Sequence, residues 1–310
     1  PAASLGVVVE ADGPLAVAVD GRPWARYAGR VEVAASGGRL LVVNALPLER
    51  YLVGVVGLEM DPAWPLEALK AQAVASRTYA LHQRRARRAG GQQARPAWPY
   101  DLEAGILDQA YSGLAGEDAR AAAAVLATRE EWLADAGGEP ILALFHSTAG
   151  GRTEAAAEVF RRPLPYLVSL LCPFDRASPV FAWRWTVAVE EVEARLLEAG
   201  YPAAGLEALG IGERTASGRV RTVLVETRAG RFALPATELR RLLGYGRLRS
   251  TRFAVEREGA WFRFDGQGAG HGVGLCQWGA RGMALAGHGY LAILSFYYPG
   301  TRWVRGTGGA

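Results

Sequence analysis

Residues 66–88 predict one long helix, and this stretch constrains the fold more than any other part of the chain. Its alanine-rich faces allow neighbouring elements to approach closely. The predicted helix stops at Gly90-Gly91, as helix ends commonly do. An apolar run with helical spacing, Leu48–Val56, comes shortly before it and predicts a second helix. Residues 91–99 are rich in Gln, Pro and Gly and predict a connection.

The first 45 residues predict β-structure. Asp12-Gly13 and Gly37-Gly38 each lie between two strand-like stretches, so each predicts a tight hairpin turn. The stretches are 5–10 and 15–19 around the first turn, and 31–35 and 40–43 around the second. We therefore expect a small antiparallel layer that leads into the helices.

Short helices and strands alternate in the rest of the chain. We expect helices at 116–128, 189–199, 236–243, 278–286 and 291–297. We expect strand pairs at 132–133 with 141–146 around Gly137-Gly138, 219–226 with 231–234, and 250–256 with 261–264. The predicted fold class is α+β. The predicted parts are an N-terminal β layer at 1–45, a mixed catalytic unit from 46–174 and 266–310, and an inserted β-rich subdomain at 175–265.

The composition excludes several classes of protein. Half of the residues are hydrophobic and 21% are charged, as in an ordinary soluble globular chain, and no apolar run approaches the ~20 residues that span a bilayer. The net charge of +4 is compatible with an anionic polymer such as cell wall. Two cysteines exclude a disulfide-built scaffold and a Cys-rich zinc module. Neither a GxxxxGK[ST] phosphate-binding loop nor an HExxH motif is present. We expect no nucleotide and no nucleic acid as partner.

Glu59 lies at the end of the apolar run that begins at Leu48. Its carboxyl is therefore expected at the edge of an apolar core, where desolvation raises a carboxyl pKa and allows the protonated form to act as an acid. From this residue alone, a helix-end carboxylate in a salt bridge is the simpler interpretation.

Gln72, Ser76 and Tyr79 share one face of the long helix, at spacings of four and three residues. Such a polar stripe either faces solvent or lines a polar groove. The spacing alone favours solvent.

Two histidines lie beside glycines. His146 precedes Gly150-Gly151, and a lone histidine at a strand end usually has a structural role. His271 lies within 268–274, where four glycines imply an unusual backbone path, as in a site loop. The GxGxxG-like spacing there opens no clear helix, so it is weak support for a nucleotide site.

Three long stretches carry the strongest signal. They are LPLERYLVGVVGLEM at 46–60 with WPLEALKAQAVASRTYA at 64–80, FHSTAGGRTE at 145–154, and GQGAGHGVGLCQWGA at 266–280 with FYYPGT at 296–301. Together they resemble the stage II sporulation protein D family, which includes the LytB amidase enhancers. Motif order and spacing agree over roughly residues 46 to 301, which is nearly the whole chain.

The resemblance implies a peptidoglycan lytic transglycosylase that cleaves between N-acetylmuramic acid and N-acetylglucosamine. Its substrate would be glycan strands from which an amidase has already removed the stem peptides. The family's catalytic glutamate falls on Glu59. The resemblance places substrate contacts on Lys70, Gln72, Arg77, Tyr79, His146, Ser147, Gly150, Gly151, His271 and Gln277.

One acid is enough for this reaction. Ordinary glycosidases use two carboxylates, because the second activates water or attacks carbon. A lytic transglycosylase uses the sugar's own 6-hydroxyl as nucleophile, so Glu59 would donate a proton to the leaving oxygen and then accept one from that hydroxyl.

The sequence departs from the family pattern at two positions. Ala269 stands where an aromatic residue is usual, and Cys276 stands where Ser or Thr is usual. Some family members hold zinc, so His146, Cys172, His271 and Cys276 are weak metal candidates, although the family's ligand pattern does not map onto them. Packing is the simpler role for a buried cysteine, and the expected cofactor is none.

Two other functions stay open. The chain could be a non-catalytic wall-binding protein that activates an N-acetylmuramoyl-L-alanine amidase, or a zinc hydrolase. The expected partners are peptidoglycan glycan strands and a cell-wall amidase. The chain begins at Pro1 without methionine, as a processed product that has lost an upstream export signal would. With cell wall as the substrate that the resemblance implies, we expect an extracytoplasmic protein, secreted or anchored through a segment absent from this chain.

Overall fold

The computed structural model describes residues 4–18, 24–36, 38–88, 100–105 and 108–306. By contacts between residues, the chain forms two compact units. Unit 1 consists of residues 1–143, 289–291 and 301–310, and unit 2 of residues 144–288 and 292–300. This division groups 144–174, 266–288 and 292–300 with the β-rich segment, whereas the sequence grouping joined 144–174 and 266–310 to 46–143.

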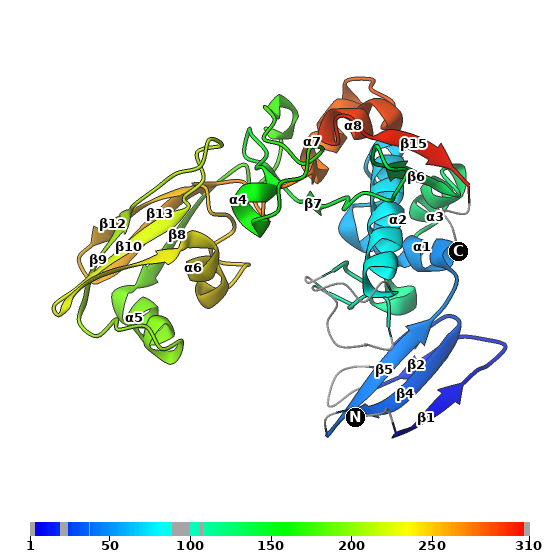
Figure 1. Ribbon diagram of the computed structural model, residues 1–310, viewed down its shortest axis with the longest axis horizontal. Coiled ribbons are helices and arrows are strands. Elements are labelled where there is room, and N and C mark those ends of the chain that lie inside the picture. The colour runs from blue at the N-terminus through cyan, green and yellow to red at the C-terminus, as the bar shows by residue number, and fades with distance from the viewer. Residues whose placement is uncertain (1–3, 19–23, 37, 89–99, 106–107, 307–310) are drawn as a thin grey trace. The chain divides into compact units, whose positions relative to one another are not determined.

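Unit 1 combines a β layer with a group of helices (Figure 1). Its strands are β1 (Ser4–Val9), β2 (Leu15–Val17), β3 (Ala25–Tyr27), β4 (Arg30–Ser36), β5 (Arg39–Ala45), β6 (Glu131–Ala134) and β15 (Arg302–Arg305). Its helices are α1 (Leu48–Glu59), α2 (Leu66–Arg88), the 3-10 turn η1 (Gly113–Gly116) and α3 (Ala119–Ala127). The two long predicted helices are therefore confirmed, while the predicted stop at Gly90-Gly91 and the connection 91–99 lie outside the described residues.

The β layer of unit 1 pairs differently from the prediction. The β4–β5 hairpin is confirmed, with Gly38 at φ +77°, a conformation that glycine adopts without strain. The first predicted hairpin is wrong. β1 pairs antiparallel with β4, and β2 pairs with β3. Because β4 is a seven-residue strand with its second edge available, it offers β1 a longer partner than the three-residue β2 does.

The pairing around Gly137-Gly138 is also only partly as expected. β6 forms its ladder with β15, and only the bridge between Ala134 and Pro140 remains of the predicted hairpin. In α3, Asp118 is the N-cap, and its side chain accepts hydrogen bonds from two backbone N–H groups of the first turn. This helix is thus shorter than predicted, because the cap fixes its start at Ala119.

Unit 2 contains the strand-rich segment (Figure 1). Its strands are β7 (Phe145–His146), β8 (Ala182–Ala188), β9 (Leu206–Ile211), β10 (Thr222–Thr227), β11 (Gly230–Pro235), β12 (Phe253–Glu258), β13 (Trp261–Gln267) and β14 (Leu275–Cys276). Its helices are α4 (Ala156–Phe160), the 3-10 turn η2 (Pro173–Asp175), α5 (Val189–Glu198), α6 (Ala236–Leu243), α7 (Gln277–Leu285) and, from Ala292 on, α8 (Tyr290–Tyr297).

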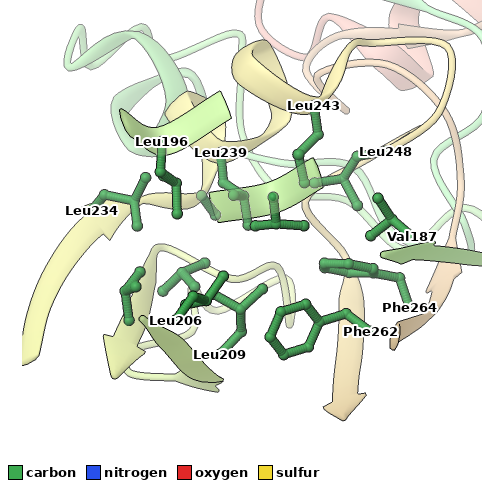
Figure 2. Packing of buried hydrophobic residues seen from close by; sticks show 14 of the residues in the cluster. Val187, Leu196, Leu206, Leu209, Leu234, Leu239, Leu243, Leu248, Phe262 and Phe264 are labelled. Atoms are coloured by element: carbon green, nitrogen blue, oxygen red, sulfur yellow. The ribbon is translucent and has the colours of Figure 1, made fainter. Parts of the chain in front are cut away.

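Two antiparallel three-stranded sheets, β11-β10-β9 and β12-β13-β8, hold most of the core of unit 2. Figure 2 shows Leu196 and Leu239 of the helices facing Leu209 and Phe262 of the strands. Burying such side chains stabilises a fold by roughly 1.5–3 kcal/mol each. The strand pairs and the helix 236–243 predicted from the sequence are confirmed, and so is the α+β class.

A third, parallel ladder joins distant parts of the sequence. β7 pairs with β14, so that Leu275 lies opposite Phe145 and Cys276 opposite His146. The histidine and glycine-rich motifs of unit 2 are brought side by side in this way. Within the described residues, no helix combines the length and the apolar character that a membrane crossing requires.

Candidate active site

Glu59 is the last residue of α1, and the apolar side chains of this helix are the reason for its position. Leu52, Val55 and Val56 are completely buried, which fixes the helix against its neighbours. Glu59 itself is half-buried, and its Oε1 accepts a hydrogen bond of 2.8 Å from the backbone N–H of Ala110. The carboxyl therefore lies at the edge of the core, as the sequence predicted, and a backbone donor orients it.

The loop that supplies this donor is held by both long helices. Tyr51 of α1 donates to Gln109 Oε1 at 3.2 Å, and Gln109 Nε2 donates to the carbonyl oxygen of Ser76 in α2 at 3.3 Å. Asp108 accepts a hydrogen bond of 2.7 Å from the Tyr79 hydroxyl. Burial and the carboxylates of Asp108 and Glu59 raise the pKa of Tyr51, so this phenol stays protonated near Glu59.

Glycines let a second backbone approach α1 closely at the same place. A Cβ placed on Gly57 would overlap the carbonyl oxygen of Gly116, and one on Gly116 would overlap that of Gly54. Helix α1 and η1 thus pack backbone against backbone, a contact that only glycine permits. This packing fixes the end of α1 and therefore the position of Glu59.

The polar stripe of α2 faces the protein interior, so the expectation of solvent is wrong. Gln72, Ser76 and Tyr79 are all buried, and residues 108–109 contact Ser76 and Tyr79. Gln72 donates to the Ser76 hydroxyl at 2.9 Å. The stripe thereby anchors the loop that holds Glu59.

Arg77 is also buried, with 1% of its surface exposed. It forms a bidentate pair with Glu49, at 2.8 and 2.6 Å, and donates to the carbonyl oxygen of Glu131 at 3.0 Å. These contacts join α2 to α1 and β6. The geometry gives Arg77 a structural role and does not support the substrate contact predicted for it.

Lys70 is the most exposed of the predicted α2 residues. Its Nζ donates to Glu67 at 2.6 Å and lies 5.6 Å from the centre of the Tyr290 ring. Burial acts to raise the pKa of Glu67, but the hydrogen bonds from Lys70 and from the Tyr290 backbone outweigh it and lower that pKa. Lys70 and Glu67 thus form an ion pair at the surface of unit 1.

A pocket of about 830 Å³ lies in unit 1, between the β layer and α2. Tyr51, Tyr111 and Arg84 are among its lining residues, but Glu59 is not. The Tyr111 hydroxyl donates to Asn44 Oδ1 at 2.7 Å inside this pocket. The pocket therefore adjoins the residues around Glu59 without containing the carboxyl.

In unit 2, His146 and His271 face one another with ring centres 5.7 Å apart. His146 Nδ1 contacts the carbonyl oxygen of Val273 at 3.1 Å, and the Val273 N–H donates to His271 Nδ1 at 3.0 Å. Burial and the neighbouring Arg240 and Arg219 lower the pKa of His271 to about 4, and burial with the facing His271 lowers that of His146. Both rings are therefore neutral near pH 7.

The other predicted residues of unit 2 lie around the same ladder. Gly150 and Gly151 have φ of +71° and +93°, and their N–H groups donate to Asp175 Oδ2 at 2.7 and 3.4 Å. Ser147 contacts the Thr148 hydroxyl at 3.2 Å. Gln277 is the first residue of α7 and is buried. The HSTAGG motif thus forms a loop whose amides bind a carboxylate of the same unit.

The predicted metal candidates are not brought together as a set. In the part of the chain that the structure describes, the atoms of Cys172, Cys276 and Asp175 that can bind a metal lie within 4.8 Å of one another, and the two histidines do not belong to this group. Sequence reasoning missed Asp175. Its position three residues after Cys172 was the available signal.

These acidic groups influence one another. A hydrogen bond from Cys276 lowers the pKa of Cys172, whereas burial and the Cys172 sulfur raise the pKa of Cys276. Burial also raises the pKa of Asp175. Both cysteines are free and buried.

The predicted site residues therefore fall into two groups. Glu59 and the α2 residues belong to unit 1, and the histidine and glycine motifs belong to unit 2.

Comparison with known proteins identifies the family. Residues 36–134 match the family model of the stage II sporulation protein, and residues 165–274 match a domain of unknown function. The chain is 33% identical over 270 residues to the stage II sporulation protein D of Bacillus amyloliquefaciens, covering 83% of this chain and 74% of that protein. It is 31% identical over 268 residues to the protein of the same name from Bacillus subtilis, covering 84% of this chain and 75% of that protein.

A more distant relative is the amidase enhancer of Bacillus subtilis, 28% identical over 298 residues. The alignment covers 81% of this chain but only 40% of that protein. This α+β protein, with its helix-end glutamate in the matched segment, belongs to the stage II sporulation protein D family. The resemblance stated from the motifs is confirmed.

Proposed function

We propose that this chain is a lytic transglycosylase of peptidoglycan, with Glu59 as its acid and base. The observation that carries the proposal is the Glu59 carboxyl, half-buried at the end of α1 and bound by the Ala110 N–H, inside the segment that matches the family. The substrate we propose is a glycan strand without stem peptides, cut between N-acetylmuramic acid and N-acetylglucosamine.

The proposed reaction needs two proton transfers at one carboxyl. Because the Ala110 N–H can only donate, Glu59 Oε1 must accept, and the proton of the acid form sits on Oε2. That proton passes to the leaving glycosidic oxygen as the bond to the muramic C1 breaks. The muramic 6-hydroxyl then bonds to C1 and gives its proton to the carboxylate, which restores the acid and leaves a 1,6-anhydro end without consuming water.

The surroundings of Glu59 support this cycle. Tyr51 remains a neutral phenol, and the Asp108–Tyr79 contact fixes the loop that carries Ala110. A preorganised donor at a reacting group costs no rearrangement during the reaction. We place the reaction outside the cytoplasm, where peptidoglycan lies, and an amidase that removes stem peptides would supply the substrate.

The test compares wild-type protein with Glu59→Gln on peptide-free glycan strands, with products analysed by mass spectrometry. We expect 1,6-anhydro ends from the wild type and a rate reduced by roughly 10²–10⁴-fold in the variant, which is the usual contribution of an acid–base residue. Glu139→Gln, which changes a 63% exposed carboxylate of unit 1, is the matched control and should keep full activity. Reducing ends would mean that water is the nucleophile and would contradict the proposal.

A second candidate function is activation of an amidase without catalysis. The name of the Bacillus subtilis relative, amidase enhancer, favours it. If neither denuded nor intact wall is cleaved, and Glu59→Gln still stimulates a purified cell-wall amidase, the activator is the correct function.

A further inference from the structure

Three groups that can bind a metal meet in the interior of unit 2. Cys172 lies just before η2, Asp175 ends η2, and Cys276 lies at the end of β14, where it is the N-cap of α7. All three side chains are 0% exposed. The cluster thus joins two segments that are far apart in the sequence, and water does not screen it.

The spacing of these groups fits one small cation. Cys276 Sγ lies 3.7 Å from Asp175 Oδ2, and all three candidate atoms lie within 4.8 Å of one another. Tetrahedral zinc, with bonds of ~2.3 Å to sulfur and ~2.0 Å to oxygen, sets sulfur–oxygen separations of about 3.5 Å. Small side-chain movements would complete this geometry.

An unpartnered oxygen provides independent support. Asp175 Oδ1 is buried, and among the described residues it has no hydrogen-bond partner. Buried polar atoms nearly always have a partner, so this oxygen of the clustered carboxyl group points to a ligand outside the chain. Because every group in the cluster is a ligand type that cations bind, a cation satisfies all of them at once.

The surrounding residues are arranged as an outer shell. The N–H groups of Ala149 and Gly279 donate to Cys276 Sγ at 3.2 and 3.3 Å, and the Gly150 N–H donates to Asp175 Oδ2. The Tyr297 hydroxyl lies 3.2 Å from Cys172 Sγ. Such hydrogen bonds to the ligands orient metal sites and stabilise thiolates.

Space beside Cys172 is kept clear by Gly279. A Cβ on this residue would lie 2.8 Å from Cys172 Sγ and would overlap the Tyr297 hydroxyl. Two cationic side chains, Arg219 and Arg252, contact the carbonyl oxygens of Ala149 and Gly150, so positive charge lies near the cluster. These cations balance the negative charge that remains when two thiolates and one carboxylate bind a divalent ion.

We propose that Cys172, Asp175 and Cys276 bind one Zn²⁺ ion that fastens η2 to the start of α7. Binding releases the thiol protons to solvent and involves no oxidation or reduction. The Tyr297 hydroxyl then donates to the Cys172 thiolate. The fourth position of the metal takes a small ligand such as water. Neither His146 nor His271 is a ligand.

The first measurement is the metal content of the purified full chain, prepared without a histidine tag, by inductively coupled plasma mass spectrometry. We expect about one zinc per chain, falling at least tenfold in Cys172→Ser, Asp175→Asn and Cys276→Ser. Asp265→Asn, a more exposed carboxylate of the same unit, and His271→Gln are the controls and should keep the metal. Loss of zinc in His271→Gln would overturn the proposed ligand set.

Measurements on the wild type keep the proposal testable if a variant does not fold. Cobalt exchanged into the site should give sulfur-to-metal charge-transfer absorption, and chelation should lower the melting temperature of unit 2 by roughly 5–10 °C. Both thiols should react with a thiol reagent only after chelation. A native chain with no bound metal, or with a Cys172–Cys276 disulfide in mass spectrometry, would overturn the proposal. None of these readouts depends on glycan cleavage, so their failure is distinct from failure of the proposed function.

Discussion

Replacing Gly57 by alanine tests whether the close approach of α1 and η1 holds Glu59 in place. The added Cβ would lie 2.1 Å from the Gly116 carbonyl oxygen, whereas Cβ atoms in proteins essentially never come within 3.0 Å of such an atom. The obstacle is backbone, so η1 must move away by about 1 Å before ordinary contact is restored.

Two effects of opposite sign decide the result. Alanine in a helix is favoured over glycine by about 1 kcal/mol, which stabilises α1. Overpacking against an immovable neighbour costs about 1–3 kcal/mol and occasionally more, and a carbonyl within a packed turn is at the upper end. We therefore expect the free energy of unfolding to fall by about 1–2 kcal/mol. For a unit of this size the melting temperature should fall by roughly 2–8 °C.

The proposed glycan cleavage should slow as well, because η1 begins three residues after Ala110, the donor to Glu59. A displacement of about 1 Å commonly costs up to 10²-fold in rate. Urea unfolding followed by circular dichroism measures the stability, and hydrogen exchange of peptides from 48–59 assigns the change to α1. Gly246→Ala, where a Cβ meets open space, is the control and should change the stability by less than about 0.5 kcal/mol. A Gly57→Ala chain that is as stable and as active as the wild type would refute the reasoning.

Two further predictions concern buried charge. Arg77→Met should lower the free energy of unfolding by about 2–4 kcal/mol in urea titrations, because it removes the cation that pairs with Glu49 and the donor to the Glu131 carbonyl. A loss below about 1 kcal/mol would contradict the structural role of Arg77. The folded pKa of His271 is about 4, below its ordinary value, so the unfolded chain binds the extra proton. The stabilisation from neutral His271 is fully present above pH ~6.5 and should be lost as the pH falls toward 4, at up to about 1.4 kcal/mol per pH unit. His271→Gln should reduce this dependence of the unfolding free energy on pH. An unchanged dependence would exclude His271 as its source.

Local patterns predicted most elements of the fold. Residues 66–88 form α2 with the predicted bounds, because a long run of helix-favouring residues needs no distant partner to define it. The β4–β5 hairpin and the β10–β11 pair were predictable for the same reason, since a tight turn sets the register of neighbouring strands. The β1–β4 pairing was not predictable, because choosing among several possible strand partners depends on tertiary contacts.

The candidate site was predicted in part. The position of Glu59 at the edge of the core followed from the apolar residues of α1. The burial of Gln72, Ser76 and Tyr79 did not, because helical spacing identifies a polar face but cannot tell what covers it. The part of Asp175 in the cysteine cluster could not be predicted, because the groups that contact it are distant in the sequence. These groups are Cys276 and the amides of Gly150 and Gly151.

The pairing of β8 with β13 has a consequence for the order in which unit 2 folds. Cys172 and Cys276 are about 100 positions apart, but Ala182 lies opposite Gln267 once this pair has formed. The paired strands then connect residue 182 directly to residue 267. The loop that joins the two cysteines is thereby reduced to about 20 residues, 172–182 and 267–276. Loop-closure entropy grows with the logarithm of length, so the shortening lowers the cost of bringing the two cysteines together by about 1.5 kcal/mol. Pairing of β8 with β13 therefore favours formation of the cysteine cluster. The cluster is expected to assemble late, after these sheets are complete.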